Sequence, residues 1–105
     1  MEKKYSVVIT TCSNDEEVRK ITSALLEKKI AACIQAFPIS SYYTWKGEVC
    51  NENEIALLIK CNQNHYAEIE TVILKTHSYD LPEIILLPIN NGLDKYLSWI
   101  DEVSR

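Results

Sequence analysis

The stretch SYYTWKGEV (Ser41–Val49) lies inside the longest extended segment of the sequence and indicates where the chain reverses. Residues 31–45 loosely alternate apolar and polar side chains, and an extended pattern resumes over residues 48–61. Two such runs separated by Lys46-Gly47 are typical of one long β-hairpin. Pro38 cannot donate a sheet hydrogen bond, so the first arm is expected to bend, bulge or lie at an edge there. The outer part of this hairpin is longer than a chain of 105 residues can easily cover.

Before the hairpin, the pattern changes from extended to helical. Residues 5–11 (YSVVITT) are β-branched and aromatic, which favours a strand. Ser13 and Glu16 have the spacing of a capping box, so we predict that Ser13 opens a helix over residues 14–29. Its apolar residues recur at helical spacing and predict one face packed on a sheet.

After the hairpin, the same alternation of elements returns. Residues 63–76 have a helical apolar stripe, with Asn62 or Asn64 as the expected N-cap. The run EIILLP over residues 83–88 is short and wholly apolar in its centre, which predicts a strand buried on both faces. A last short helix is expected after the turn at Asn91-Gly92.

The resulting order, βαββαβα, predicts an α+β fold. Crossovers between parallel strands are right-handed, and the simplest sheet that satisfies them is the ferredoxin-like βαββαβ sandwich, with the long β-hairpin and a short C-terminal helix added. We expect residues 1–105 to form a single domain. Both main helices would cover one sheet face, so we predict that the other face and the hairpin are buried between subunits.

Composition narrows the classes of partner. The formal net charge is −4, which disfavours nucleic acid and anionic membranes as partners. No apolar run approaches the roughly 20 residues of a membrane span, and the N-terminal segment does not fit a secretory leader. Four cysteines lie far apart without a C-x-x-C pair, so we expect free thiols, no zinc knuckle, and a cytoplasmic protein.

Two residues are candidate metal ligands. His77 follows the second helix and precedes a turn, where an accessible neutral imidazole is available to a metal. Cys12 ends the first strand, and the start of the following helix would lower the pKa of its thiol. A thiolate and an imidazole suit copper, although two ligands alone leave a site that needs water, a third group or a second subunit.

A second constellation lies near the hairpin and the fourth strand. It could position an anionic or zwitterionic small ligand in a cleft between subunits, and Trp45 near the hairpin tip is either part of that binding surface or an anchor in a subunit contact. No nucleophile is tied by a motif to His77, the single plausible base, so we do not expect an enzyme. Asp80 belongs to the same charged constellation. The residues of the predicted cleft itself are Trp45, Glu54, Lys60, Tyr79 and Glu83.

Several motifs together resemble the CutA divalent-cation tolerance proteins, in order and over nearly the whole chain. They are AACI (residues 31–34), SYYTWKGEV (41–49), EIALLIK (54–60), HSYDLPEI (77–84) and YLSWI (96–100). The resemblance implies a ferredoxin-like subunit in a tight homotrimer, a role in tolerance of copper and other divalent metal ions, and copper bound by a cysteine near the end of the first strand and a histidine in an HPYE-type motif. It also implies an alternative, because the topology is similar to that of trimeric PII signalling proteins that bind small metabolites between subunits.

The sequence departs from the family pattern at the proposed metal site. Ser78 replaces the usual proline after the histidine, and Asp80 occupies the following acidic position. Thr76 precedes His77, so the histidine pair of some members is reduced to one. The ligand cysteine of some bacterial members falls at Thr11, with Cys12 beside it on the opposite face of an ideal strand.

Overall fold

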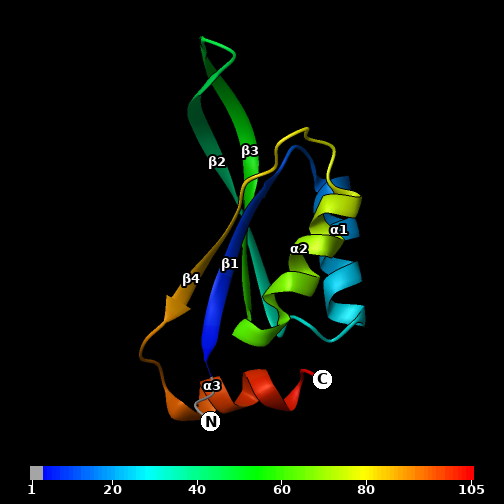
Figure 1. Cartoon of the computed structure of the whole chain (residues 1–105), viewed down its shortest axis with the longest axis vertical. Coiled ribbons are helices and arrows are strands. Elements are labelled where there is room, and N and C mark those ends of the chain that lie inside the picture. Colours follow the sequence, from blue (N-terminus) through cyan, green and yellow to red (C-terminus); the bar gives the residue numbers. More distant parts are fainter. Residues whose placement is uncertain (1–3) are drawn as a thin grey trace.

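A computed structural model describes residues 4–105 of the chain and confirms the predicted order of elements (Figure 1). A 3-10 turn, η1, precedes the second helix, where one continuous helix was predicted. The elements are β1 (Tyr5–Cys12), α1 (Asp15–Glu27), β2 (Cys33–Trp45), β3 (Glu48–Asn62), η1 (Gln63–His65), α2 (Tyr66–Thr76), β4 (Ile84–Ile89) and α3 (Asp94–Glu102).

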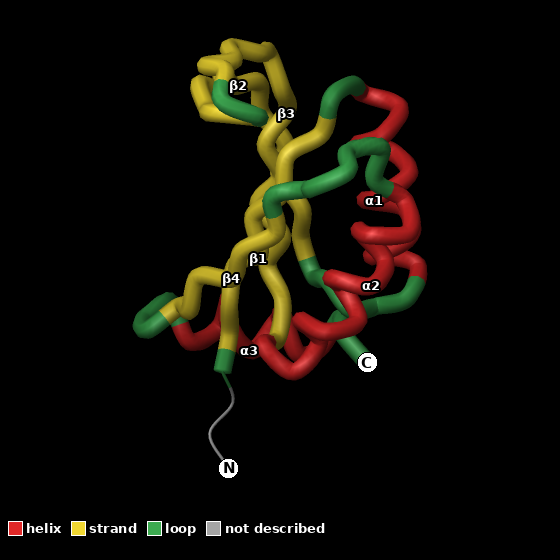
Figure 2. Tube along the Cα trace, turned by 45° about the horizontal axis from the view of Figure 1, so that its top comes forward, coloured by secondary structure: helices red, strands yellow, loops and turns green. Residues whose placement is uncertain are grey.

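The four strands form one antiparallel sheet in the order β2-β3-β1-β4. Helices α1 and α2 lie side by side over one face of this sheet, while the β2–β3 hairpin extends beyond them (Figures 1 and 2). This is the α+β, ferredoxin-like arrangement that the sequence predicted. In the described part of the chain, no helix is long and apolar enough to cross a bilayer.

The hairpin reverses at the dipeptide that the sequence indicated. Trp45 pairs with Glu48, so Lys46 and Gly47 form a two-residue loop, and both have positive φ angles, 50° and 80°. Positive φ at both positions gives the local twist that matches two right-twisted strands. Pro38 lies in β2, which pairs with β3 alone in this sheet, so the strand has a free edge as predicted.

The core lies between the sheet and the two long helices. Side chains from alternate positions of β1 and β3 pack against apolar residues of both helices and are fully buried. Because side chains alternate across a strand, the neighbouring positions point to the opposite face. Fully buried core residues include Val8, Ile21, Leu25, Leu57, Ile59, Ile69 and Ile73.

The opposite sheet face, here called the open face, is incompletely covered. Phe37, Ile85 and Leu87 lie on it, and 43%, 46% and 48% of their surfaces are exposed. The prediction that the fourth strand is buried on both faces is therefore wrong for the subunit. The unbroken apolar run means that both faces of β4 carry apolar side chains. However, β4 is an edge strand, and the helices cover only one of its faces (Figure 1).

Helix α3 crosses the lower end of the molecule in Figure 1 and ties its C-terminal segment to the sheet. Asp101 accepts hydrogen bonds from the Tyr5 hydroxyl (2.6 Å) and the Asn62 side-chain amide (3.1 Å). Lys60 lies over the ring of Tyr96, with 5.5 Å from its Nζ to the ring centroid. Ile100 is fully buried and anchors the helix.

The start of α1 differs from the prediction by one residue. Asn14, not Ser13, is the N-cap, and its side chain accepts from the Glu17 N–H at 2.9 Å. Glu17 in turn accepts from the Ser13 N–H at 3.1 Å. Glu16, the expected partner in the capping box, instead lies 3.5 Å from Lys20 on the exposed side of the helix.

Candidate functional site

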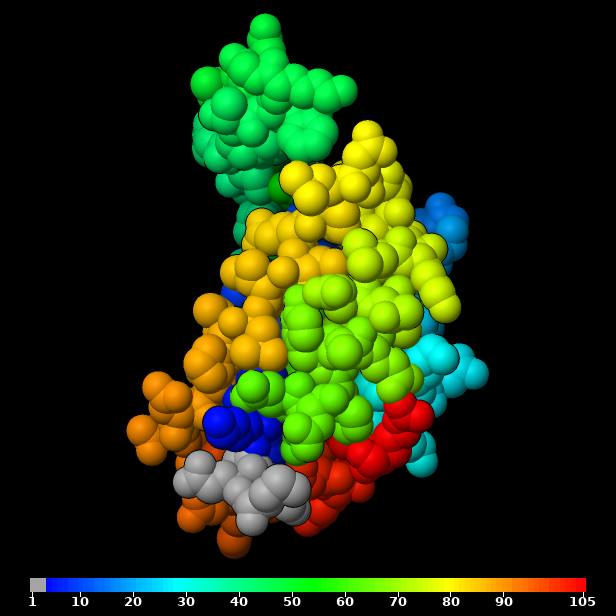
Figure 3. Space-filling view, in the orientation of Figure 1, coloured from blue at the N-terminus to red at the C-terminus, as the bar shows by residue number. Residues whose placement is uncertain are grey.

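A pocket of about 600 Å³ lies between the hairpin and the segment that connects α2 to β4. In the space-filling view, a notch separates the hairpin from this connecting segment (Figure 3). Aromatic, hydroxyl and carboxylate side chains from β1, the hairpin and the connecting segment line the pocket. They are Thr11, Ser41, Tyr42, Tyr43, Thr44, Trp45, Glu52, Glu54, Tyr79, Asp80, Leu81 and Glu83.

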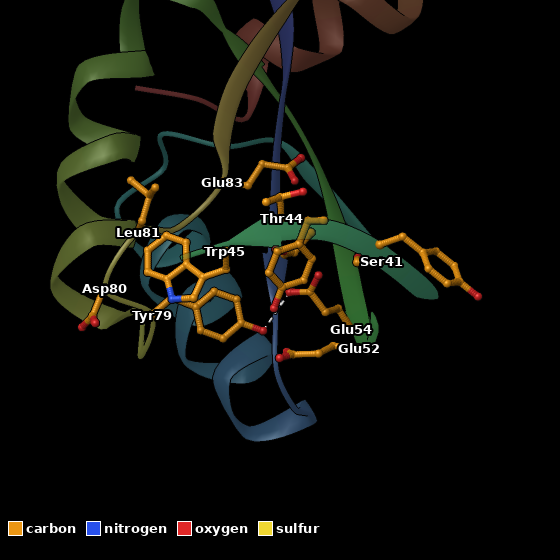
Figure 4. Close-up of a pocket in the computed structure, with 12 residues that line it drawn as sticks. Ser41, Thr44, Trp45, Glu52, Glu54, Tyr79, Asp80, Leu81 and Glu83 are labelled. Carbon is orange, nitrogen blue, oxygen red and sulfur yellow. Dashed lines mark hydrogen bonds between the residues drawn. The ribbon is translucent and has the colours of Figure 1, made fainter. Parts of the chain in front are cut away.

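Glu54 is the most enclosed carboxylate of the pocket, with 8% of its surface exposed. The Tyr79 hydroxyl donates to Glu54 Oε2 at 2.7 Å, as the dashed line in Figure 4 shows. Burial raises the pKa of Glu54, but hydrogen bonds from Ser41, Tyr79 and Thr11 outweigh it, so the net pKa lies below the ordinary value. Burial, followed by this contact with Glu54, raises the pKa of Tyr79. Glu54 is therefore a fixed negative charge at neutral pH.

The pocket as a whole carries one sign of charge. Glu52, Glu54, Asp80 and Glu83 line it, and among residues 4–105 no lysine, arginine or histidine does. The carboxylates do not converge on one point, since Asp80 points away from Glu52 and Glu54 in Figure 4. Such a lining attracts cations and repels anions.

Tyr43 makes a second contact between a tyrosine and a carboxylate of the pocket, like that of Tyr79 with Glu54. A hydrogen bond with Glu52, followed by burial and the charge of Glu52, raises the pKa of Tyr43 to about 12. Trp45 lines the same pocket as Leu81 and Tyr79 (Figure 4). The hairpin thereby contributes the aromatic wall of the pocket, and the connecting segment contributes the other wall.

His77 is the first residue of the connecting segment, and its side chain is buried, contrary to the expectation from the sequence that it would be accessible. Its side chain is 1% exposed. Nε2 lies 2.5 Å from the Thr11 carbonyl oxygen, and Nδ1 lies 3.1 Å from the Tyr79 N–H that donates to it. The end of β1 passes directly alongside the turn, and a single sequence does not reveal that contact.

Glu17 lies next to His77 and holds the same turn. Its Oε1 is 3.8 Å from His77 Nε2, and its Oε2 accepts from the Ser78 N–H at 3.0 Å. Burial raises the pKa of Glu17, whereas hydrogen bonds from Ser78 and Ser13 and the proximity of His77 lower it, with a net lowering. Sequence analysis missed this role, although an acid at the third helical position after an asparagine N-cap is a signal that could have found it.

Cys12 is fully buried on the core side of β1. The prediction that the start of α1 lowers its thiol pKa is wrong: burial, followed by the charges of Glu17 and Glu54, raises the pKa to about 12. A helix terminus favours a thiolate when the sulfur faces it in a polar setting, but this sulfur packs among aliphatic side chains. The thiol is therefore protonated in the folded subunit.

The structure brings four of the five residues of the predicted cleft together. Trp45, Glu54, Tyr79 and Glu83 all line the pocket, whereas Lys60 lies over Tyr96 beside α3. Without Lys60, the described residues give the pocket no positive charge for the anionic or zwitterionic ligand that the sequence suggested. Sequence analysis missed the contributions of Thr11, Ser41 and Glu52, which the register of the sheet brings to the same end.

The described side chains do not form a ready metal site. Within residues 4–105, no group of three or more histidine, cysteine, aspartate or glutamate side chains could hold one. His77 uses both ring nitrogens inside the chain, and Cys12 is a buried thiol. These two residues do not fit copper as they stand, because copper needs an unprotonated sulfur and a free nitrogen lone pair.

Comparison with known proteins identifies the family. The family model described as CutA1 divalent ion tolerance protein matches residues 6–103. The divalent-cation tolerance protein CutA of Archaeoglobus fulgidus is 38% identical, over 93% of this chain and 96% of that protein. Human protein CutA is 32% identical, over 95% of this chain but 56% of its own length.

Solved structures agree with this assignment. The divalent cation tolerance protein of Thermus thermophilus superposes with a TM-score of 0.92 at 35% identity, covering 96% of this chain and 99% of that one. A structure described as the periplasmic CutA of Archaeoglobus fulgidus gives the same score at 37% identity, covering 94% and 97%. The resemblance seen in the sequence motifs is thus confirmed, and the chain belongs to the CutA1 divalent ion tolerance protein family.

Proposed function

We propose that this protein is a homotrimer that binds divalent cations, copper or another, and contributes to tolerance of them. The single observation that carries the binding role is the pocket lined by four carboxylates with no basic side chain among the described residues. The family name supports a role with divalent ions. The open face of the sheet supports assembly, because it exposes large apolar side chains that a second copy could cover.

The shape of the subunit supports the same assembly. Its radius of gyration is 14.4 Å, above the roughly 13 Å expected for a compact chain of this length. The excess comes from the hairpin, whose outer residues Tyr42 and Val49 are 74% and 81% exposed. A hairpin that its own chain does not cover can lie against the open face of a neighbouring copy, and a closed ring leaves no such surface unpaired.

The cation proposal replaces the ligands expected from the sequence. The pocket offers carboxylate and hydroxyl oxygens, which suit Mn²⁺ or Mg²⁺ better than Cu(I). Since these groups do not converge in one subunit, we propose that the pocket attracts a hydrated ion and that a neighbouring copy supplies further ligands. Binding would then depend on the assembled protein.

Isothermal titration with Mn²⁺ and with Cu²⁺ tests this proposal. Replacing Glu54 and Glu83 together by glutamine should weaken binding by about tenfold or more, while Glu27→Gln, an exposed carboxylate on α1, should leave it unchanged. Unaltered affinity in the double variant would refute the carboxylate pocket as the binding site.

A small organic ligand is the second candidate, in keeping with the PII-like alternative. The observation that favours it is the pocket itself, since about 600 Å³ with several aromatic side chains is in the range of small-molecule sites. A thermal-shift screen of metabolites in EDTA should then show stabilisation by an organic cation. If no metabolite shifts the melting temperature while divalent cations bind, the organic-ligand proposal is refuted and only the cation proposal stands.

We also propose a binding role rather than catalysis, and a cytoplasmic location. Both ring nitrogens of His77 contact backbone groups, so this base is paired with no nucleophile. All four cysteines are free thiols, which suits a reducing compartment. Cell fractionation, followed by thiol alkylation under denaturing conditions, should recover the protein in the cytoplasmic fraction with four alkylated cysteines. Recovery outside it would contradict the location.

A further inference from the structure

We infer that His77 is a positioning residue, fixed as the neutral Nε2–H tautomer, that holds the segment 78–81 in place as a wall of the pocket and does not ligate a metal. The inference concerns the residue at which the family resemblance places a copper ligand. It depends on hydrogen-bond geometry within the subunit and is independent of the cation proposal.

Two contacts fix the same tautomer independently. The Tyr79 N–H can only donate, so Nδ1, 3.1 Å away, must accept and carry no proton. The Thr11 carbonyl oxygen can only accept, so Nε2, 2.5 Å away, must carry the proton. A neutral imidazole has one donor and one acceptor nitrogen, and both are used here.

The surroundings leave a metal no route to either nitrogen. The side chain is 1% exposed, and the Tyr79 ring lies against it with 4.5 Å between ring centroids. An ion at Nδ1 would displace the Tyr79 N–H, and an ion at Nε2 would displace the Thr11 carbonyl. Either exchange leaves a partly buried backbone group without its hydrogen-bond partner, which is unfavourable.

Both oxygens of the nearest carboxylate, that of Glu17, already accept hydrogen bonds from backbone N–H groups. Glu17 Oε1 accepts from the Ser13 N–H at 3.1 Å, and Oε2 accepts from the Ser78 N–H at 3.0 Å. Glu17 and His77 therefore hold consecutive residues of the same turn, at Ser78 and Tyr79. The turn is held from two sides, by the start of α1 and by the end of β1.

This support reaches the pocket through one further hydrogen bond. Tyr79, whose N–H is held by His77, donates its hydroxyl to Glu54 at 2.7 Å. Thr11, whose carbonyl accepts from His77, lines the same pocket. His77 thus fixes the position of Tyr79. Through the Tyr79 hydroxyl it also fixes the orientation of the buried Glu54 carboxylate.

Three substitutions separate positioning from ligation. The Asn side-chain oxygen in His77→Asn can take the place of Nδ1, the Gln amide in His77→Gln can take the place of the Nε2 donor, and His77→Ala removes both. Positioning predicts that the melting temperature falls in the order wild type, then Asn and Gln, then Ala, and that Cu²⁺ affinity is unchanged in His77→Asn. Loss of Cu²⁺ binding in all three variants, with unchanged melting temperatures, would overturn the inference.

Nuclear magnetic resonance gives a readout that holds even if His77→Ala does not fold. The chain has two histidines, so ¹⁵N signals of the rings are assigned by comparison with His65→Gln. At about pH 8, where a free imidazole is neutral, His77 should show a protonated Nε2 and a bare Nδ1. These signals, and the slow exchange of the Tyr79 amide, should persist when Zn²⁺ is added. A Zn²⁺-dependent shift of either ring nitrogen with loss of Tyr79 protection would show that His77 is a ligand.

Discussion

The two faces of the sheet are built from similar apolar residues, yet they have different surroundings. On the covered face Val8, Leu57 and Ile59 are fully buried beneath α1 and α2. On the open face Ile85 and Leu87 are nearly half exposed. Burial of apolar surface therefore stabilises the subunit on the covered face, whereas the apolar surface of the open face remains available for assembly.

Two adjacent leucines of β4 show the difference in burial between the two sheet faces most directly. Leu86 pairs with Val8 in the register and packs against the core cluster, whereas Leu87 pairs with Val7 and faces outward. They share residue type, strand and backbone environment. Comparing them therefore isolates what covers each face.

The largest expected effect comes from placing a charge on each face in turn. Leu86→Asp should destabilise the subunit by about 3–5 kcal/mol, because it removes core packing and buries a carboxylate. Leu87→Asp carries the same strand-propensity cost but should leave the subunit folded and shift the assembly to a single chain of 12.1 kDa. Urea denaturation, circular dichroism and sedimentation measure the two outcomes. Equal loss of subunit folding in both variants would remove the distinction between the faces.

The next effect concerns a carboxylate on the covered side. Glu17→Gln should cost about 2 kcal/mol, since two backbone N–H groups lose a charged acceptor. Its neighbour Glu16 makes one exposed ion pair with Lys20, so Glu16→Gln should cost less than about 0.5 kcal/mol. Chemical denaturation of the two variants measures the difference. Matching losses would mean that the turn at Ser78 does not depend on Glu17.

The pH dependence of stability gives the same carboxylate a separate signature. The pKa of Glu17 in the folded state lies below its value of 4.5 without the fold. Its contribution is therefore present above pH 4.5 and is lost as the pH falls through the folded pKa. Unfolding free energies measured from pH 7 down to about 3 should decline less steeply in Glu17→Gln than in the wild type. Identical slopes would contradict the assignment.

The smallest expected effect lies at the pocket. Tyr79→Phe removes the hydroxyl that donates to Glu54, and should cost about 1 kcal/mol because Ser41 and Thr11 still hold the carboxylate. The pKa of Glu54 should rise, which a carboxyl titration by nuclear magnetic resonance would detect. A Glu54 pKa that did not move would mean that Tyr79 plays no part in fixing this charge.

Local patterns predicted most of the fold. The Lys46-Gly47 turn, the helical stripes and the strand order each depend on nearby residues or on general connection rules, and all are present. Whether β4 is buried on both faces could not be predicted from the local sequence, because an apolar run does not show which sheet faces other elements will cover. The start of α1 was placed one residue early because Ser13 and Asn14 are both good caps.

The site was predicted less well, because it depends on contacts between distant segments. Trp45, Glu54, Tyr79 and Glu83 were found from their chemistry, and all four line the pocket between the hairpin and the connecting segment. Lys60 was misplaced, since its position along β3 puts it at the other end of the sheet, beside α3. His77 was expected to be accessible because its pairing with the end of β1 spans 66 residues of sequence.

Sedimentation equilibrium of the unmodified protein, from micromolar concentration downward, tests most directly whether the open face is covered by other copies. The account predicts a stable particle of about 36 kDa, three times the 12.1 kDa mass of the chain. A folded particle of 12.1 kDa across that range would contradict it.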